Sequence, residues 1–324
     1  EVIALAERPL FRTAPAPLHM LSRCVRDTGI KVALTGEGAD ELFGGYDIFK
    51  ESKVRRLWAR QPDSSQRPRL LQRLYPYLNL DNGHQGAFQK KFFTRGLGDT
   101  SDPLYSHRLR FASSARNLRF MRADALEEAF KNGKPEERLL DYLPDTFGAM
   151  SSLGKAQYLE ITTFLSGYLL HAQGDRMMMG NSVEGRFPFL DHRLAEFAAG
   201  LPDRLKLHGL NEKYLLRKAV EDLLPERAQR RAKQPYRAPI TQAFVAADAP
   251  EYVSDILSAD SLQKAGIFDV PKAERLFDKC RTTDAGRVSE SDEMAYVGML
   301  STMLLHDRFI AHPHEAPSAM PSKV

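Results

Sequence analysis

The sequence predicts an α/β protein that is predominantly helical and contains one element of a parallel sheet. The run from Ile30 to Leu34 is rich in β-forming residues and is expected to be a buried strand. The glycine-rich turn after it leads into a short helix that starts at Ala39 and ends early at Gly44-Gly45. From about Asp47 onward the pattern is helical, so helices should make up most of the chain.

Several later segments have the apolar spacing of core helices. In the segment from Leu190 to Leu201, apolar residues recur on one helical face. A long helix is expected over 291–309, and polar connections over 61–67 and 82–100. The other expected helices cover 50–60, 67–80, 124–130 and 158–170. These elements assign residues 1–311 to one domain and 312–324, rich in proline and serine, to a disordered tail.

The composition excludes several classes of protein. The formal net charge of +4 over 324 residues is too small to imply nucleic acid, and Tyr236 alone gives the basic stretch 227–237 no stacking platform. The apolar run 164–170 is far shorter than the ~20 residues of a membrane span. Cys24 and Cys280 form neither a disulfide framework nor a metal-binding pattern, so a cytoplasmic location is expected.

The turn after the expected strand carries the acidic residues Glu37, Asp40 and Glu41. A glycine-rich turn at the carboxyl end of a strand is a common nucleotide site. Bare carboxylates would repel phosphates unless a hard cation such as Mg²⁺ lies between them. Acids in the first turn of a helix also favour the helix dipole, so a structural explanation has about equal weight on spacing alone.

Four ordered segments resemble the synthetase domain of the class B, glutamine-hydrolysing asparagine synthetases. The first is LTGEGADELFGGY, Leu34 to Tyr46, and the second is DRMMMGNSVEGRFPFLDHRLAEFAAGLP, Asp175 to Pro202. The third is EKYLLRKAVEDLLPERAQRRAKQPYRAP, Glu212 to Pro239, and the fourth is SESDEMAYVGMLSTMLLHDRF, Ser289 to Phe309. The resemblance spans nearly the whole chain and is least distinct over 50–151. It implies the C-terminal part of a phosphate-loop-type, adenine nucleotide alpha hydrolase-like domain with a large helical remainder.

Members of this family activate aspartate with ATP, release pyrophosphate and let ammonia attack the β-aspartyl adenylate. The resemblance implies that Thr35 and Gly36 contact ATP and that Asp40 helps to hold Mg²⁺ at the pyrophosphate. Glu37 matches the family position that supports adenylate formation and guides the attack of ammonia, where a carboxylate could accept a proton. For Thr35, Gly36 and Asp40, turn geometry and a helix-start charge are the structural alternatives.

Two basic residues complete the expected site. Lys233 matches the family lysine that steadies the departing pyrophosphate, where a fixed ammonium would stabilise the developing charge. A solvated basic loop is the alternative for Lys233. Arg186 could bind the α-carboxylate of the substrate with both arms of its guanidinium, or it could belong to an ion-pair network around Phe187-Pro188-Phe189. The methionines Met177 to Met179 are expected to fill the core.

Two parts expected of the family are missing from the sequence. These are the Ser-Gly-Gly-x-Asp-Ser phosphate loop and the N-terminal glutaminase domain with its catalytic cysteine. We therefore expect the chain alone to be inactive and to need a missing domain or a partner chain that supplies ammonia from glutamine. The chain begins with Glu1 in what resembles the middle of a domain, and a homodimer is compatible with the sequence.

Two other functions stay open at this point. An amide- or lactam-forming enzyme of secondary metabolism could use the same adenylation with another carboxylic acid. Glu37 favours asparagine synthesis over lactam formation, since the lactam-forming relatives carry a different residue there. A non-catalytic scaffold is the remaining alternative, and the retained Glu37, Asp40 and Lys233 oppose it.

Overall fold

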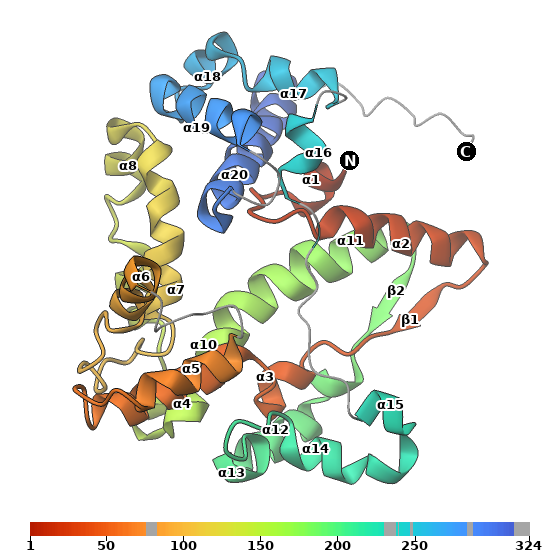
Figure 1. Ribbon diagram of the computed structural model, residues 1–324. Helices are drawn as coiled ribbons and strands as arrows, with labels where there is room; N and C mark the ends of the chain where they lie inside the picture. Colours follow the sequence, from red (N-terminus) through yellow and green to blue (C-terminus); the bar gives the residue numbers. More distant parts are fainter. Residues whose placement is uncertain (76–82, 230–237, 239, 247–248, 284–287, 314–324) are drawn as a thin grey trace.

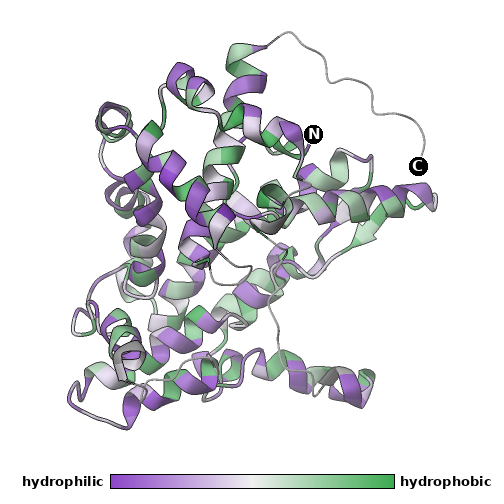
Figure 2. Cartoon of the chain, turned by 45° about the horizontal axis from the view of Figure 1, so that its top comes forward, coloured by the Kyte–Doolittle hydropathy of each residue, from purple (hydrophilic) through white to green (hydrophobic). Residues whose placement is uncertain are grey.

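The computed structural model describes residues 1–75, 83–229, 238, 240–246, 249–283 and 288–313, and all structural statements concern these residues. A small parallel sheet lies at one edge of a mostly helical molecule, as Figure 1 shows. The mostly helical α/β class is therefore confirmed. Hydrophilic and hydrophobic residues are interleaved along the helices, which is visible in Figure 2 and typical of helices with one buried face. The expected tail 312–324 lies almost wholly outside the described residues.

The first half of the chain contains ten α-helices among the described residues. They are α1 (Val2–Ala6), α2 (Pro15–Asp27), α3 (Ala39–Phe43), α4 (Asp47–Ala59), α5 (Leu70–Leu74), α6 (Gly83–Phe93), α7 (Arg108–Ala115), α8 (Ala123–Ala129), α9 (Pro135–Asp141) and α10 (Ser152–Glu160). Short 3-10 turns add η1 (Arg67–Arg69), η2 (Arg116–Phe120) and η3 (Asp145–Ala149).

The second half is also helical. Its described α-helices are α11 (Arg176–Met179), α12 (His192–Gly200), α13 (Asp203–Lys206), α14 (Tyr214–Ala219), α15 (Glu226–Gln229), α16 (Gln242–Val245), α17 (Glu251–Ile256), α18 (Ala259–Ala265), α19 (Val270–Thr282) and α20 (Glu290–His306). The segments η4 (Ile161–Asp175) and η7 (Asp307–Ala311) are π-helical, whereas η5 (Pro188–Leu190) and η6 (Glu221–Leu223) are 3-10 turns.

The sheet consists of two parallel strands, β1 (Val32–Leu34) and β2 (Glu184–Arg186). No residue pattern predicted β2, which is only three residues long and holds a glycine. Gly185 lies against α11, and a Cβ atom there would come within 2.4 Å of Met178 Cε. The sheet therefore depends on a glycine to pack closely against the helix beside it.

The strand Ile30 to Leu34 was expected to be buried, and this expectation is wrong. Val32 is 37% and Leu34 is 74% exposed, whereas Ala33 between them is half-buried. Alternate side chains of a strand point to opposite faces. Among the described residues, no layer covers the face that carries Val32 and Leu34, which explains the apolar exposure.

A continuous helix from Ser152 to Met179 crosses the middle of the molecule as α10, η4 and α11 (Figure 1). Its central part is π-helical, which is unusual over 15 residues. The hydroxyls of Thr162 and Thr163 donate to the carbonyls of Tyr158 and Leu159, at 2.9 and 2.6 Å. These bonds compete with backbone N–H groups for the same carbonyls at the start of the π-helical segment.

The largest apolar cluster joins α17 to α20 at the C-terminal end of the chain. Tyr296, Met299, Leu300 and Met303 of α20 lie in it, and each is at most 4% exposed. This confirms the expected long C-terminal helix. Among the helices of the described residues, none is sufficiently long and apolar to cross a membrane.

The segment 82–100 was expected to be a connection, but α6 occupies Gly83–Phe93. Its glycines and polar residues favour helix weakly. Packing overrides that preference, because Phe93 is buried and stacks on Tyr75 with ring centroids 6.1 Å apart. Phe93 belongs to a second cluster that also contains Trp58 and Leu71, both 0% exposed.

Two further sequence expectations are confirmed in most of their residues. The apolar face of 190–201 packs with Leu194 and Ala198 against α3, although Phe197 is 59% exposed. Met177 and Met178 are buried core residues, whereas Met179 is 62% exposed at the end of α11. Met179 escapes the core because it is the last residue of α11, where the buried face of the helix ends.

Replacing Leu71 by alanine should lower the free energy of unfolding by about 2–5 kcal/mol, because the fully buried side chain leaves a cavity. Trp58 is the only tryptophan of the chain and lies in the same cluster, so its fluorescence during urea unfolding reports the loss. Leu21→Ala, at a position that is 58% exposed, is the control and should change stability by about 0.5 kcal/mol or less. Equal midpoints for the two variants would contradict the assignment of this core.

Candidate functional site

The carboxyl ends of the two strands meet at the predicted site. The N–H group of Thr35, directly after β1, donates to the carbonyl of Arg186 at the end of β2, at 2.9 Å. Thr35 and Arg186 come from motifs about 150 residues apart in the sequence, and the sheet brings them together. In parallel α/β sheets this edge is where ligands bind.

The turn after β1 leaves both backbone space and backbone donors. A Cβ atom added at Gly36 would meet no atom within 4 Å. The N–H groups of Gly36, Glu37 and Gly38 find no acceptor among the described residues. Consecutive unpaired N–H groups in a turn suit an anionic ligand, so the geometry fits the phosphates of a nucleotide.

Gly38 fixes the shape of this turn. Its φ of 92° is left-handed, which favours glycine. A Cβ atom there would also lie 2.3 Å from Leu190 Cδ2. The second glycine of the turn is thus a structural requirement, whereas Gly36 faces open space.

Glu37 is half-buried and accepts a hydrogen bond from the hydroxyl of Thr35. The bond ties the two residues predicted to act on the nucleotide and on the nitrogen nucleophile. A carboxylate held by one neighbour keeps other lone pairs available, because an ionised carboxylate has about four acceptor sites.

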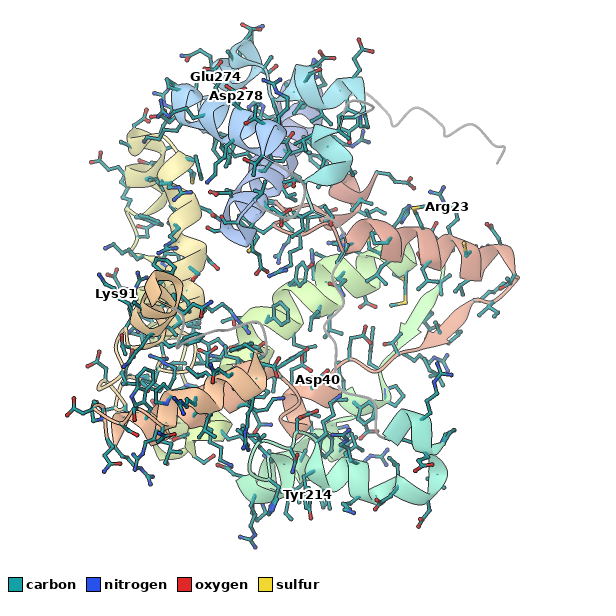
Figure 3. All side chains as sticks on the ribbon, in the orientation of Figure 1. Arg23, Asp40, Lys91, Tyr214, Glu274 and Asp278 are labelled. Atoms are coloured by element: carbon teal, nitrogen blue, oxygen red, sulfur yellow. The ribbon has the colours of Figure 1, made fainter. Side chains whose placement is uncertain are left out.

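Asp40 lies in the first turn of α3 and pairs with Lys213. Lys213 Nζ is 3.1 Å from Asp40 Oδ1, and the two side chains are 26% and 23% exposed. Figure 3 labels Asp40 on α3, with Tyr214 marking the start of α14 directly after Lys213. Lys213 was inside a recognised motif but was not singled out, because no sequence signal distinguishes it from the other lysines there.

Two backbone features hold this pair in place. Lys213 has a φ of +51°, which is uncommon for a residue other than glycine, and its N–H donates to the carbonyl of Phe43 at 3.1 Å. A Cβ atom at Gly45 would lie 1.9 Å from Asp40 Oδ1 and 2.5 Å from Lys213 Cε. Gly45 is therefore needed so that both side chains can reach each other.

A Mg²⁺ ion would find few protein ligands here. The described residues contain no group of three or more acidic, histidine or cysteine side chains placed to hold a metal ion. Magnesium often binds through one or two carboxylates with phosphate oxygens and water. Glu37 and Asp40 fit that pattern and would require the phosphates of the nucleotide to complete the coordination.

Arg186 is exposed, and its Nε donates to Glu184 Oε1 at 2.8 Å. The guanidinium thus belongs to an ion pair at the end of β2, which is the structural alternative considered for it, while its position beside Thr35 keeps it at the edge of the site. Lys233 lies outside the described residues.

Behind the turn, Glu41 points into the interior. It is 1% exposed, and the hydroxyl of Tyr46 donates to its Oε1 at 2.8 Å. Burial raises the pKa of Glu41, although the hydrogen bond from Tyr46 opposes this. Of the three acids in the turn, Glu41 is therefore structural, whereas Glu37 and Asp40 remain nearer the surface.

A buried polar chain runs close to Glu41. Ser106 Oγ lies 2.9 Å from His107 Nδ1, and His107 Nε2 lies 2.8 Å from Glu160 Oε2, which also accepts from Arg110 at 2.6 Å. The order resembles a hydrolytic triad. Ser106 is only 6% exposed, and His107 and Glu160 are 0% exposed. These three hydrogen-bonded side chains therefore stabilise the core and cannot reach a substrate.

The comparisons identify the family. Residues 1–306 match the family described as Asparagine synthase, and the chain belongs to it. The chain is 31% identical to an asparagine synthetase [glutamine-hydrolyzing] 1 of Bacillus subtilis over 77% of this chain and 37% of that protein. It is 28% identical to a putative asparagine synthetase of Mycobacterium tuberculosis over 96% of this chain and 44% of that protein.

The relatives also include a protein with a different name. Amidase chry2 of Gibberella zeae is 26% identical over 77% of this chain and 38% of its own length. The chain thus spans about two-fifths of the curated relatives that it matches. Domains of the asparagine synthase family use ATP, which agrees with the donors and the open space at Gly36.

Gly45→Ala should separate Asp40 from Lys213, because the added Cβ would take the place of Asp40 Oδ1 and lie against Lys213 Cε, so both side chains would have to turn away. The expected loss is about 0.5–1 kcal/mol in the free energy of unfolding, the contribution of a partly exposed ion pair, measured by urea titration. Gly36→Ala, where no atom lies within 4 Å, is the matched control and should leave stability almost unchanged. If the Gly45→Ala protein were as stable as the Gly36→Ala protein, the ion pair between Asp40 and Lys213 would not contribute to stability.

His107→Gln should make stability less sensitive to acid. Burial lowers the pKa of His107, with Glu160 opposing, so the unfolded chain takes up a proton as the pH falls below about 6.5 while the folded chain does not. Stability of the natural chain therefore falls with pH in this range. The glutamine amide can donate to Glu160 in place of Nε2 without titrating, so the slope between pH 7 and 5 should flatten in denaturant titrations.

The control for this experiment is His192→Gln, at an exposed position in α12. It should preserve the slope of the natural chain. An unchanged slope in His107→Gln would show that His107 does not contribute to the acid sensitivity.

Proposed function

We propose that the chain supplies the aspartate-activating part of an ATP-dependent amide ligase that makes asparagine, with ammonia released from glutamine by a domain or partner outside this chain. The observation that carries the proposal is the meeting of Thr35 and Arg186 at the carboxyl ends of β1 and β2. This edge joins the acidic glycine-rich turn to the second motif. The family membership of residues 1–306 supports the same chemistry.

The first step proposed is adenylation. The β-carboxylate of aspartate attacks the α-phosphorus of ATP, the bond to the β-phosphate breaks, and pyrophosphate leaves. Gly36 gives the nucleotide close access to the backbone, and Thr35 lies beside it. Asp40 would hold Mg²⁺ at the pyrophosphate, and Lys233 would stabilise the charge that develops on it.

The second step proposed is aminolysis. Ammonia attacks the acyl carbon of the adenylate, the bond to AMP breaks, and the nitrogen loses a proton. Glu37 is the proposed acceptor of that proton, held by the hydroxyl of Thr35. Arg186 is proposed to bind the α-carboxylate of aspartate with the guanidinium nitrogens that do not contact Glu184.

A second candidate is an amide ligase for another carboxylic acid. The similarity to Amidase chry2 favours it, because that relative matches a share of this chain equal to that of the Bacillus synthetase. The acidic turn and Lys233 would serve adenylation of any carboxylate. The two candidates differ only in the acid that is bound, so a panel of acids separates them. In either case residues 1–311 are proposed to form one domain of a cytoplasmic enzyme.

The test is pyrophosphate release by the longer protein that contains this chain, with a panel of carboxylic acids. Aspartate should be preferred, and Glu37→Ala and Lys233→Ala should each lower the rate by about 10²–10³-fold because charge stabilisation or proton transfer is lost. Lys218→Ala is the control, since Lys218 pairs with Glu221 at the surface of α14. Preference for another acid would favour the second candidate, and undiminished rates in both variants would remove Glu37 and Lys233 from the mechanism.

A further inference from the structure

The carbonyl groups at the end of α3 are satisfied from three different parts of the chain. The carbonyl of Asp40 accepts from Gly45 N–H at 2.7 Å, and that of Phe43 accepts from Lys213 N–H at 3.1 Å. The helix has only five residues, so it cannot be stable alone. Its position, and that of the acidic turn before it, must come from such outside bonds.

The remaining two carbonyls both depend on Gln157 of α10. Gln157 Nε2 donates to the carbonyl of Glu41 at 2.6 Å and to that of Leu42 at 2.8 Å. The side chain is 6% exposed, so water does not replace these bonds. The amide group of Gln157 therefore donates to two of the four carbonyls from Asp40 to Phe43.

The other end of the same amide faces a buried lysine. Lys206 Nζ, at the end of α13, donates to Gln157 Oε1 at 3.2 Å. An ammonium can only donate and a carbonyl can only accept, so the amide has one possible orientation. Lys206 therefore donates to Gln157, and Gln157 donates to the carbonyls of α3.

The buried charge also suits the helix that it faces. Lys206 is 3% exposed, and a positive charge near the carboxyl end of a helix is favourable. Its Cβ lies 3.7 Å from the place of a Cβ at Gly44, so α13 packs directly on the cap of α3. Gly44, with a φ of 70°, ends the helix at this contact.

We propose that Gln157 is a positioning residue for the acidic turn, fixing α3 and through it Glu37 and Asp40. Gln157 touches neither the reacting groups nor the strand ends. It acts through the carbonyls of Glu41 and Leu42, the residues that directly follow Asp40. The inference rests on the proposed function only for the role of the turn, and the contacts stand without it.

The test separates the two ends of the amide by two substitutions in the 324-residue chain. Gln157→Glu keeps the shape and the acceptor for Lys206 but loses both donors to α3. Lys206→Met removes the buried charge but keeps both donors. Amide hydrogen exchange is followed by NMR at Leu42, Gly45 and Lys213, whose N–H groups bond to Gly38, Asp40 and Phe43.

Gln157→Glu should speed exchange at these three amides by at least about tenfold, because two buried carbonyls lose their partners. Lys206→Met should change them by less than about threefold. Amides of α19 report global stability and should change little in both variants. Gln263→Glu, the same substitution at an exposed position of α18, is the matched control and should change nothing.

A second measurement links the contacts to the proposed reaction. In the longer protein, Gln157→Glu should lower kcat for pyrophosphate release by at least about tenfold, with little change in KM for the acid. Exchange at α3 that stays within twofold of the natural chain, or that rises equally at α19, would overturn the positioning role. If the natural protein releases no pyrophosphate, the proposed function fails while the exchange result still decides the role of Gln157.

Discussion

The site depends on how a five-residue helix, too short to persist alone, is held in one place. Each carbonyl from Asp40 to Phe43 has a hydrogen-bond donor, and only the N–H of Gly45 comes from the same segment of the chain. The others come from α10 and from the residue before α14. Because a buried carbonyl without a partner costs free energy, these distant segments must dock before the acidic turn has a defined shape. The turn is thus a product of tertiary structure, although its residues are contiguous in the sequence.

Electrostatic interactions divide the three acids of the turn into two kinds. Glu41 points inward to Tyr46, and burial raises its pKa. Asp40 points toward Lys213 and Glu37 toward Thr35, both in positions that solvent and ligands can reach. Spacing alone cannot separate such roles, because Glu37 and Asp40 and their neighbour Glu41 occupy adjoining positions of one short segment. The Cβ contact at Gly45 shows how tightly the Asp40 pair is enclosed.

The sequence predicted the features that depend on local chemistry. The strand before Thr35, the early end of α3 at Gly44 and the long C-terminal helix all follow from propensity and apolar spacing. It did not predict β2, whose three residues have no strand signal and pair only because α11 places them beside β1. It also missed α6, where Phe93 packs against Tyr75 despite weak helix formers, and the exposure of Leu34, which depends on what covers the sheet. Gln157, Lys206 and Lys213 gave no signal because their roles arise only from contacts between segments far apart in the chain.

The π-helical segment between Gln157 and Met177 has a geometric consequence for the whole molecule. An α-helix advances about 100° per residue, and a wider ladder turns less at each step. Over Ile161–Asp175 this difference accumulates, so the segment sets the rotational phase between its two flanking α-helical ends. Gln157 faces α3 at one end while Met177 packs near α1 at the other, although an unbroken α-helix of equal length would turn these residues to other directions. Removing a residue from this segment would rotate one end against the other, so the length of the segment helps to decide where Gln157 meets α3.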